Sequence, residues 1–253
     1  MIKVLSGSKK PDNRLRRLID LIGQCKRVID IGTDHALLPI ILAEEDRCDC
    51  VVAIDSSVSA FNKAQRNIAK AGVGDKVTVI HGNGLKKIEI KAGDTLVLAG
   101  LGGKEIVSIL AEKLPLPDNI SVIAQAQSDL PLLREFFDSN HWIFLAEEVL
   151  ESRGHTYIIV KASTGGEIRD MSNNDTAGGD TSVRDTSVSG LSALELVLGP
   201  LLLQEWGRRE LTEAEKRYLR REYYYRKSII EPEEVDRNVI SYIETLSVKS
   251  EPQ

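Results

Sequence analysis

Short apolar runs alternate with amphipathic stretches over the first two thirds of the chain. The apolar runs predict β-strands over residues 27–31, 50–55, 76–82, 95–100, 120–125, 142–150 and 155–162. The stretches between them repeat apolar residues at helical spacing and predict helices over residues 15–24, 36–45, 57–72, 103–114 and 129–139. This alternation is typical of an α/β fold with a mostly parallel sheet.

The last two predicted strands are separated only by the segment ESRG, residues 151–154. So short a connection cannot cross over the sheet, whereas it suits a hairpin. We therefore expect an antiparallel pair at one edge of an otherwise parallel sheet.

The composition changes after residue 162. Residues 163–190 are rich in Gly, Ser, Thr, Asp and Asn and predict a flexible linker or loop. Beyond it, apolar periodicity predicts one helix over 191–206, a second over 211–230 and a short third near 232–246. Thr212 and Glu215 have the spacing of a capping box for the second helix. The predicted organisation is a nucleotide-binding α/β domain, 1–162, the linker, 163–190, and a helical region, 191–253.

Composition narrows the functional classes. The 253 residues are 42% hydrophobic and 28% charged with a net charge of -5, so any nucleic-acid surface must be local. Three cysteines, Cys25, Cys48 and Cys50, are too few for a disulfide framework or a four-ligand zinc site, and no metal is expected. No apolar run of ~18 residues and no secretory leader pattern occurs, which predicts a cytoplasmic protein without a membrane partner.

The candidate chemistry lies just after the predicted strands, where parallel sheets bind ligands. The first strand is followed by DIGTDH, in which Gly32 permits a tight turn and the next helix offers N–H groups. Asp55 ends the second strand, where a carboxylate can accept both hydroxyl protons of a ribose. The segments HGNGL and AGLGG follow the third and fourth strands.

Each of these elements alone also fits a structural role: a turn, a helix cap or a flexible corner. Together they surround one crevice. The segment GTDHAL lacks the second and third glycines of a dinucleotide fingerprint, and no phosphate-binding lysine loop is present. A ligand with ribose and adenine but no phosphate fits better, which points to S-adenosylmethionine.

Five segments carry a resemblance to a known family: DNRLRRL (12–18), DIGTDHALLP (30–39), HGNGL (81–85), LAGLGG (98–103) and LGPLLLQE (198–205). They resemble bacterial tRNA methyltransferases that act on N1 of adenine 22 with S-adenosylmethionine, over nearly the whole chain apart from 163–190. The resemblance implies a Rossmann-like, seven-stranded class I methyltransferase sheet and a C-terminal, coiled-coil-like helical appendage that helps hold the tRNA. This chain departs from the family pattern at Asn83, where an acid is usual, and at QAQ (125–127), where the family has QPN.

Two missing motifs narrow the reaction independently. Methylation of an exocyclic amino group typically uses an Asn/Asp-Pro-Pro-aromatic loop after the fourth strand, where this chain has AGLGG. Methylation at pyrimidine C5 needs a cysteine in that region, and no cysteine follows Cys50. The reaction left open is direct attack on the methyl group by a lone pair such as that of adenine N1. Catalysis would then consist mainly of aligning N1, the methyl carbon and the sulfonium.

Within that scheme, we expect cofactor binding at Asp30, Gly32, Asp55, Asn83, Gly84 and Ala99. Asp30 accepts from the methionine ammonium, directly or through water, and Asn83 and Gly84 face the adenine. Asp34 and His35 are placed near the target base, where one of them accepts from its N6 amino group; the alternatives are a helix cap for Asp34 and a packed imidazole for His35. Gly102 and Gly103 leave room for a flat base.

Two basic segments suit a folded RNA. Residues 1–27 carry eight Lys and Arg against two Asp, and residues 207–227 carry eight against four Glu, with Tyr223, Tyr224 and Tyr225 interleaved. Cations neutralise phosphates and tyrosines stack on unpaired bases. The predicted RNA contacts are Arg14, Arg16, Arg17, Arg220 and Arg221. The alternative is a solvated helix face laced with Glu-Arg pairs.

The sequence therefore predicts an enzyme, a tRNA N1-adenine methyltransferase, that acts as a monomer or weak homodimer. Two other hypotheses stay open: a small-molecule methyltransferase of the same fold, and a non-catalytic RNA-binding relative in which Asn83 and QAQ mark a decayed site.

Overall fold

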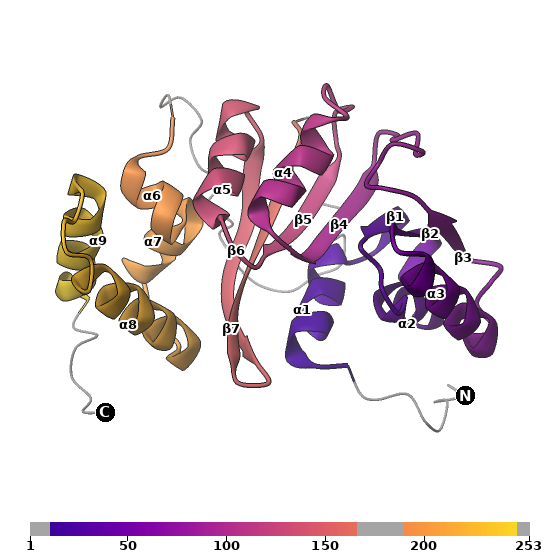
Figure 1. Ribbon diagram of the computed structural model, residues 1–253, viewed down its shortest axis with the longest axis horizontal. Coiled ribbons are helices and arrows are strands. Elements are labelled where there is room, and N and C mark those ends of the chain that lie inside the picture. Colours follow the sequence, from indigo (N-terminus) through magenta and orange to yellow (C-terminus); the bar gives the residue numbers. More distant parts are fainter. Residues whose placement is uncertain (1–10, 166–189, 247–253) are drawn as a thin grey trace, which may run out of the picture.

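A seven-stranded sheet forms the centre of the molecule (Figure 1). The structure is a computed structural model that describes residues 11–165 and 190–246, so most of the predicted linker lies outside the described residues. The strands are β1 (Cys25–Ile31), β2 (Cys48–Asp55), β3 (Val77–His81), β4 (Asp94–Leu101), β5 (Ser121–Ala126), β6 (Ile143–Ser152) and β7 (His155–Ser163).

The order across the sheet is β3-β2-β1-β4-β5-β7-β6. The strands β1 to β5 pair in parallel, whereas β7 runs antiparallel to both β5 and β6. The predicted hairpin at one edge of a parallel sheet is therefore confirmed.

Helices cover both faces of the sheet. They are α1 (Asn13–Ile22), α2 (Leu37–Glu44), α3 (Val58–Ala71), α4 (Gly103–Ala111) and α5 (Leu130–Ser139). Successive strand residues point to opposite faces, so Val28 packs into a core with α1, α2 and α3, and Ile29 into a core with α4 and α5. This explains why the strands read as continuous apolar runs.

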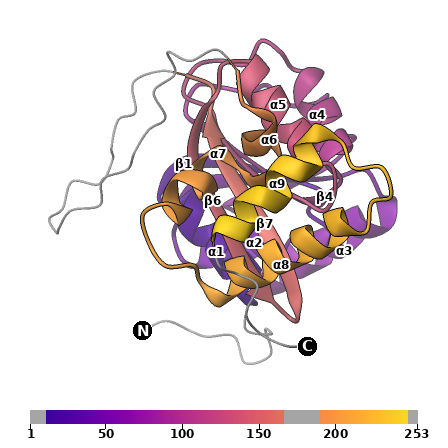
Figure 2. The ribbon, with the colours of Figure 1, turned by 90° about the vertical axis from the view of Figure 1, so that its left-hand side faces the viewer.

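The C-terminal helices extend the second core beyond the edge strand β6 (Figures 1 and 2). They are α6 (Ala193–Leu198), α7 (Pro200–Trp206), α8 (Glu213–Lys227) and α9 (Glu234–Thr245). The predicted capping box of α8 is confirmed, since Thr212 and Glu215 cap each other's backbone N–H groups. The single helix predicted over 191–206 is wrong: Gly199 adopts a φ of 106°, and Pro200 starts a new helix because it has no N–H to continue the first.

A buried ion pair joins these helices to the sheet. Arg134 on α5 and Glu147 on β6 both have fully buried side chains, with Arg134 Nε donating to Glu147 Oε1 over 2.8 Å. Arg134 Nη1 also donates to the carbonyls of Leu196 and Val197, which end α6. Glu147 Oε2 accepts from the N–H of Leu201 at the start of α7. The pair thus satisfies backbone groups on both sides of the helix break.

Removing one partner of this pair should destabilise the protein strongly. We expect Arg134→Met to lower the free energy of unfolding by about 3–5 kcal/mol, because Glu147 would stay buried and uncompensated. Arg217→Met is the matched control, since it breaks the exposed Arg217–Glu151 pair and should cost at most about 1 kcal/mol. Urea unfolding followed by tryptophan fluorescence measures both, and equal costs would contradict this account.

Candidate functional site

The strand order reverses between β1 and β4, which is where a ligand crevice is expected in a parallel sheet. The chain leaves β1 toward α2 on one face and leaves β4 toward α4 on the other. The two loops therefore diverge and leave space above the carboxyl ends of the strands.

The turn after β1 is held by internal hydrogen bonds. Gly32 has a φ of 79°, and a Cβ there would lie 3.3 Å from Leu101 Cδ2 on β4, so a glycine is required. The N–H groups of Gly32 and Thr33 both donate to the carbonyl of Ile54. These two N–H groups are therefore occupied by β2, and the free N–H groups expected at the start of α2 stay a prediction.

Asp55 organises the two turns beside it. Its Oδ2 accepts from the N–H of Asp34 at 3.0 Å, and its Oδ1 accepts from the N–H of Ser57 at 2.8 Å. Each carboxylate oxygen has a further lone pair, so the half-buried group can also accept from a ligand hydroxyl.

Asp30 is an acid buried within the sheet, with 6% of its surface exposed. Burial raises the pKa of Asp30 to about 6, the Thr33 hydroxyl lowers it, and the negative charge of Asp55 raises it. The contact with Thr33 is not a well-formed hydrogen bond, because Thr33 Oγ1 is buried without a partner. A buried acid beside an unsatisfied hydroxyl is a setting that a cationic, hydrogen-bonding ligand would complete.

Replacing Asp30 should change how stability depends on pH. The folded state binds the proton of Asp30 more tightly than the unfolded state does. The stability gained from this proton is therefore full below pH 4 and is lost as the pH rises through about 6. We expect the free energy of unfolding of Asp30→Asn, measured with urea, to exceed that of wild type at pH 7.5 by roughly 3 kcal/mol at most. This difference should shrink toward pH 4. Asp75→Asn, an exposed acid, is the control. A gap that does not vary with pH would contradict the assignment.

Asp34 and His35 are exposed at the rim of the crevice. Their side chains are 62% and 57% exposed, and His35 Nε2 lies 3.3 Å from Asp34 Oδ2. Helix α2 has Ala36 as its N-cap without a side-chain hydrogen bond, so Asp34 does not cap it, and the exposed imidazole is not packed in a core. The carbonyl of His35 accepts from Asn67 on α3, which ties this rim to the β2 side of β1.

The segment after β3 borders the same side of the crevice. Asn83 is exposed, so its amide is open to a ligand. Gly84 has a φ of 55°, and a Cβ there would lie 3.1 Å from Ile109 on α4, so close packing explains this glycine. Ala99, half-buried, precedes an irregularity in the pairing of β4 with β5.

The two glycines after β4 have different surroundings. A Cβ at Gly102 would meet only Ser128 Oγ, at 3.4 Å. At Gly103 it would lie 2.5 Å from the carbonyl oxygens of Ser128 and Asp129. The expectation that Gly103 leaves room for a base is therefore wrong, because the loop after β5 fills that space.

The same glycine-to-alanine change should therefore affect stability differently at Gly102 and at Gly103. Gly103→Ala should force the loop at Ser128 away and lower the free energy of unfolding by about 1–3 kcal/mol, with loss of activity. Gly102→Ala should leave stability within about 0.5 kcal/mol. Thermal unfolding of the two variants checks this, and equal melting temperatures would refute it.

The predicted RNA-contacting arginines all have intramolecular partners. Arg16 pairs with Glu45 at 2.6 Å, and Arg17 pairs with Glu148 through two nitrogens. Arg221 lies over the ring of Tyr218, 5.7 Å from its centroid, and Arg220 also takes part in an interaction. Arg16 and Arg17 remain 42% exposed, so RNA contact stays a prediction for them.

Arg14 differs from the other four because it points into the crevice region. Its Nη1 donates to Gln125 Oε1 at 2.8 Å, and its guanidinium lies over the ring of Tyr157, 5.3 Å from the centroid. A Cβ at Gly100 would lie 3.5 Å from Arg14 Nη1. The structure thus brings Gln125 and Tyr157 to the site, and nothing in the sequence pattern singled out Tyr157.

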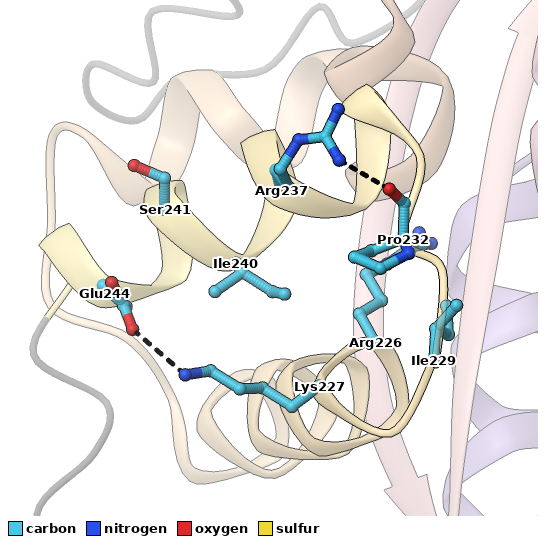
Figure 3. Close-up of a pocket in the computed structure, with 8 residues that line it drawn as sticks. All are labelled: Arg226, Lys227, Ile229, Pro232, Arg237, Ile240, Ser241 and Glu244. Atoms are coloured by element: carbon cyan, nitrogen blue, oxygen red, sulfur yellow. Dashed lines mark hydrogen bonds and ion pairs between the residues drawn. The ribbon is translucent and has the colours of Figure 1, made fainter.

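A separate pocket of about 350 Å³ lies between α8 and α9 (Figure 3). Its charged groups are partly neutralised by near neighbours: Lys227 lies 4.0 Å from Glu244, and Arg226 pairs with Asp236. Arg237 donates to the carbonyl of Pro232 at 2.6 Å. We assign no ligand to it.

Within the described parts of the chain, 11–165 and 190–246, no three His, Cys, Asp or Glu side chains gather in a way that suits a metal ion. No helix there has the length and apolar character needed to span a membrane.

The sheet order, the glycine turn after β1 and the acid after β2 are together the features of a Rossmann-like methyltransferase. Residues 12–160 match the family described as a methyltransferase domain, and the chain belongs to that family.

Curated relatives match between half and two thirds of the chain. A tRNA (adenine(22)-N(1))-methyltransferase of Bacillus subtilis (strain 168) is 29% identical over 157 residues, which cover 62% of this chain and 66% of the relative. A putative tRNA methyltransferase of Mycoplasma pneumoniae is 30% identical over 139 residues, 53% of this chain and 62% of the relative. The match therefore spans slightly under two thirds of these relatives.

Solved structures resemble the whole chain and confirm the predicted fold. A putative tRNA (m1A22) methyltransferase of Streptococcus pneumoniae, solved with S-adenosyl-L-methionine, has a TM-score of 0.73 and 24% identity, covering 92% of this chain and 97% of that one. An M. capricolum protein solved with S-adenosyl-homocysteine has a TM-score of 0.71 and 23% identity, covering 95% and 99%.

Proposed function

We propose that this protein transfers a methyl group from S-adenosylmethionine to N1 of an adenine in tRNA, at position 22. The observation that carries the proposal is the crevice at the strand reversal, with Asp30, Gly32 and Asp55 around it. The Bacillus subtilis relative, whose name states this reaction, supports the choice of substrate.

The residues present fit this cofactor. The ammonium of its methionine part would lie near buried Asp30, favour the charged carboxylate and offset part of the burial cost, and Thr33 Oγ1 is available for a further hydrogen bond. Asp55 would accept from the ribose hydroxyls, and the exposed amide oxygen of Asn83 would accept from the adenine amino group. When bound, S-adenosylmethionine supplies an electrophilic methyl group on a cationic sulfur.

The protein's own contribution to catalysis would be alignment and electrostatics. N1 carries a lone pair and needs no covalent enzyme intermediate, so the site must hold the base in line with the methyl group. Positive charge moves from the sulfur to the base during transfer, so a polar environment that tolerates this charge would assist the reaction.

The first test is methylation of unmodified bulk tRNA with labelled S-adenosylmethionine, followed by nucleoside mass spectrometry. We expect labelled 1-methyladenosine from wild type. Asp55→Ala should raise the Kd for the cofactor at least about tenfold, because a charged hydrogen-bond acceptor is lost. Exposed Asp75→Ala is the control and should leave the cofactor Kd unchanged.

Cofactor binding without any methylated nucleoside would instead favour a small-molecule methyltransferase. Absence of cofactor binding with RNA binding retained would favour a non-catalytic relative. Either result would overturn the proposal.

A further inference from the structure

Three strand ends lie beside the crevice, on the side away from Asp55. They are the carboxyl ends of β4 and β5 and the start of β7, which runs antiparallel to β5. The last described pair between β5 and β7 is Ala124 with Val160. Three residues farther along, Gln127 follows the end of β5, whereas Tyr157 stays in β7 and pairs with Leu150 of β6. Both lie past β4 in the strand order, whereas His35 is tied to α3 on the β2 side.

Tyr157 is held in place by its neighbours. The guanidinium of Arg14 lies 5.3 Å from the ring centroid, and Arg14 is itself fixed by its 2.8 Å hydrogen bond to buried Gln125. The ring of His155 meets Tyr157 edge to face at 6.4 Å. A ring fixed in this way loses little conformational entropy when a base stacks on it.

Gln127 presents an amide near Arg14, whose guanidinium lies over that ring, because a Cβ at Gly100 would lie close to both side chains. Its side chain is exposed, and among the described residues it makes no hydrogen bond. Its backbone is fixed, because its N–H donates to the carbonyl of Leu101 at 2.9 Å. Gly100, near the carboxyl end of β4, borders the same amide, since a Cβ there would be in ordinary contact with Gln127 Nε2 at 3.7 Å. The amide thus lies at the end of β4 and is open to a ligand.

We propose that Gln127 and Tyr157 form the subsite for the target adenine, with the base stacked on Tyr157 and its N6 and N7 atoms paired with the Gln127 amide. This deepens the proposed function and rests on it. A glutamine amide accepts from N6–H and donates to N7 at once. That pairing recognises adenine and leaves the lone pair of N1 free for the methyl group. The target base reaches the subsite by leaving its stack in the RNA.

The direct test removes N7 from the target adenine and, separately, the amide group from Gln127. A tRNA transcript with 7-deazaadenine at the target position lacks N7, whereas N1 and the N6 amino group remain. We expect kcat/KM of wild type to fall about tenfold on this transcript, since a bidentate contact of this kind discriminates by roughly one to two orders of magnitude. Gln127→Leu should be slower on normal tRNA by a similar factor and should show no further loss on the 7-deaza transcript.

The matched control is Gln65→Leu, which removes an exposed amide on α3 and should retain the full tenfold sensitivity. The Kd of each variant for S-adenosylmethionine, measured by calorimetry, should stay within twofold of wild type. A wild-type enzyme indifferent to the loss of N7, or a Gln127→Leu enzyme that keeps the loss, would overturn the subsite.

Tyr157 is tested by a conservative pair of variants. Tyr157→Phe should keep kcat/KM within about threefold, whereas Tyr157→Leu should lower it at least tenfold, because stacking on a base is lost. Equal rates for the two variants would overturn the role of the ring. Failure of wild type to form 1-methyladenosine on any tRNA would instead refute the proposed function, so the two failures are distinguishable.

Discussion

The position of β1 between β2 and β4 is the constraint on which the site depends. Because the chain leaves β1 and β4 toward opposite faces, the ends of neighbouring strands carry loops that part, and a crevice forms without any special side chain. The crevice has two sides. Asp55 and the turn at Gly32 lie on the β2 side, whereas the end of β4 at Gly100 and the loop after β5 at Gln127 lie on the other side. This division matches two ligands whose reacting atoms must meet above β1 and β4.

The protein buries charged groups, whose desolvation costs stability, at two places in the sheet region. Asp30 is buried among apolar strand residues, and its raised pKa is the sign of that cost. Arg134 and Glu147 are also fully buried, and they satisfy backbone groups around the break at Gly199. The ion pair has hydrogen-bond partners for most of its polar atoms among the described residues, with only Arg134 Nη2 left without one, so burial alone does not identify a functional acid.

Local patterns in the sequence predicted most of the fold. The strands, the edge hairpin and the capping box at Thr212 follow from periodicity and spacing, which are local properties. The helix break at Gly199 was missed, because apolar periodicity continues across it although the Gly-Pro pair signals a break. Asp30, Gly32 and Asp55 were predicted from their places at the ends of strands: Asp30 is the penultimate residue of β1, Gly32 follows β1, and Asp55 ends β2. The setting of Arg14 was not predictable, since it depends on a partner 111 residues away.

The central claim is that N1 of one adenine in tRNA receives the methyl group. The most direct measurement is single-turnover methyl transfer to a tRNA transcript that carries 1-deazaadenine at the target position, which replaces N1 by carbon. This account predicts unchanged cofactor binding and tight RNA binding with no methyl group at that nucleotide. Methylation of the substituted nucleotide at a rate near that of normal tRNA would contradict it.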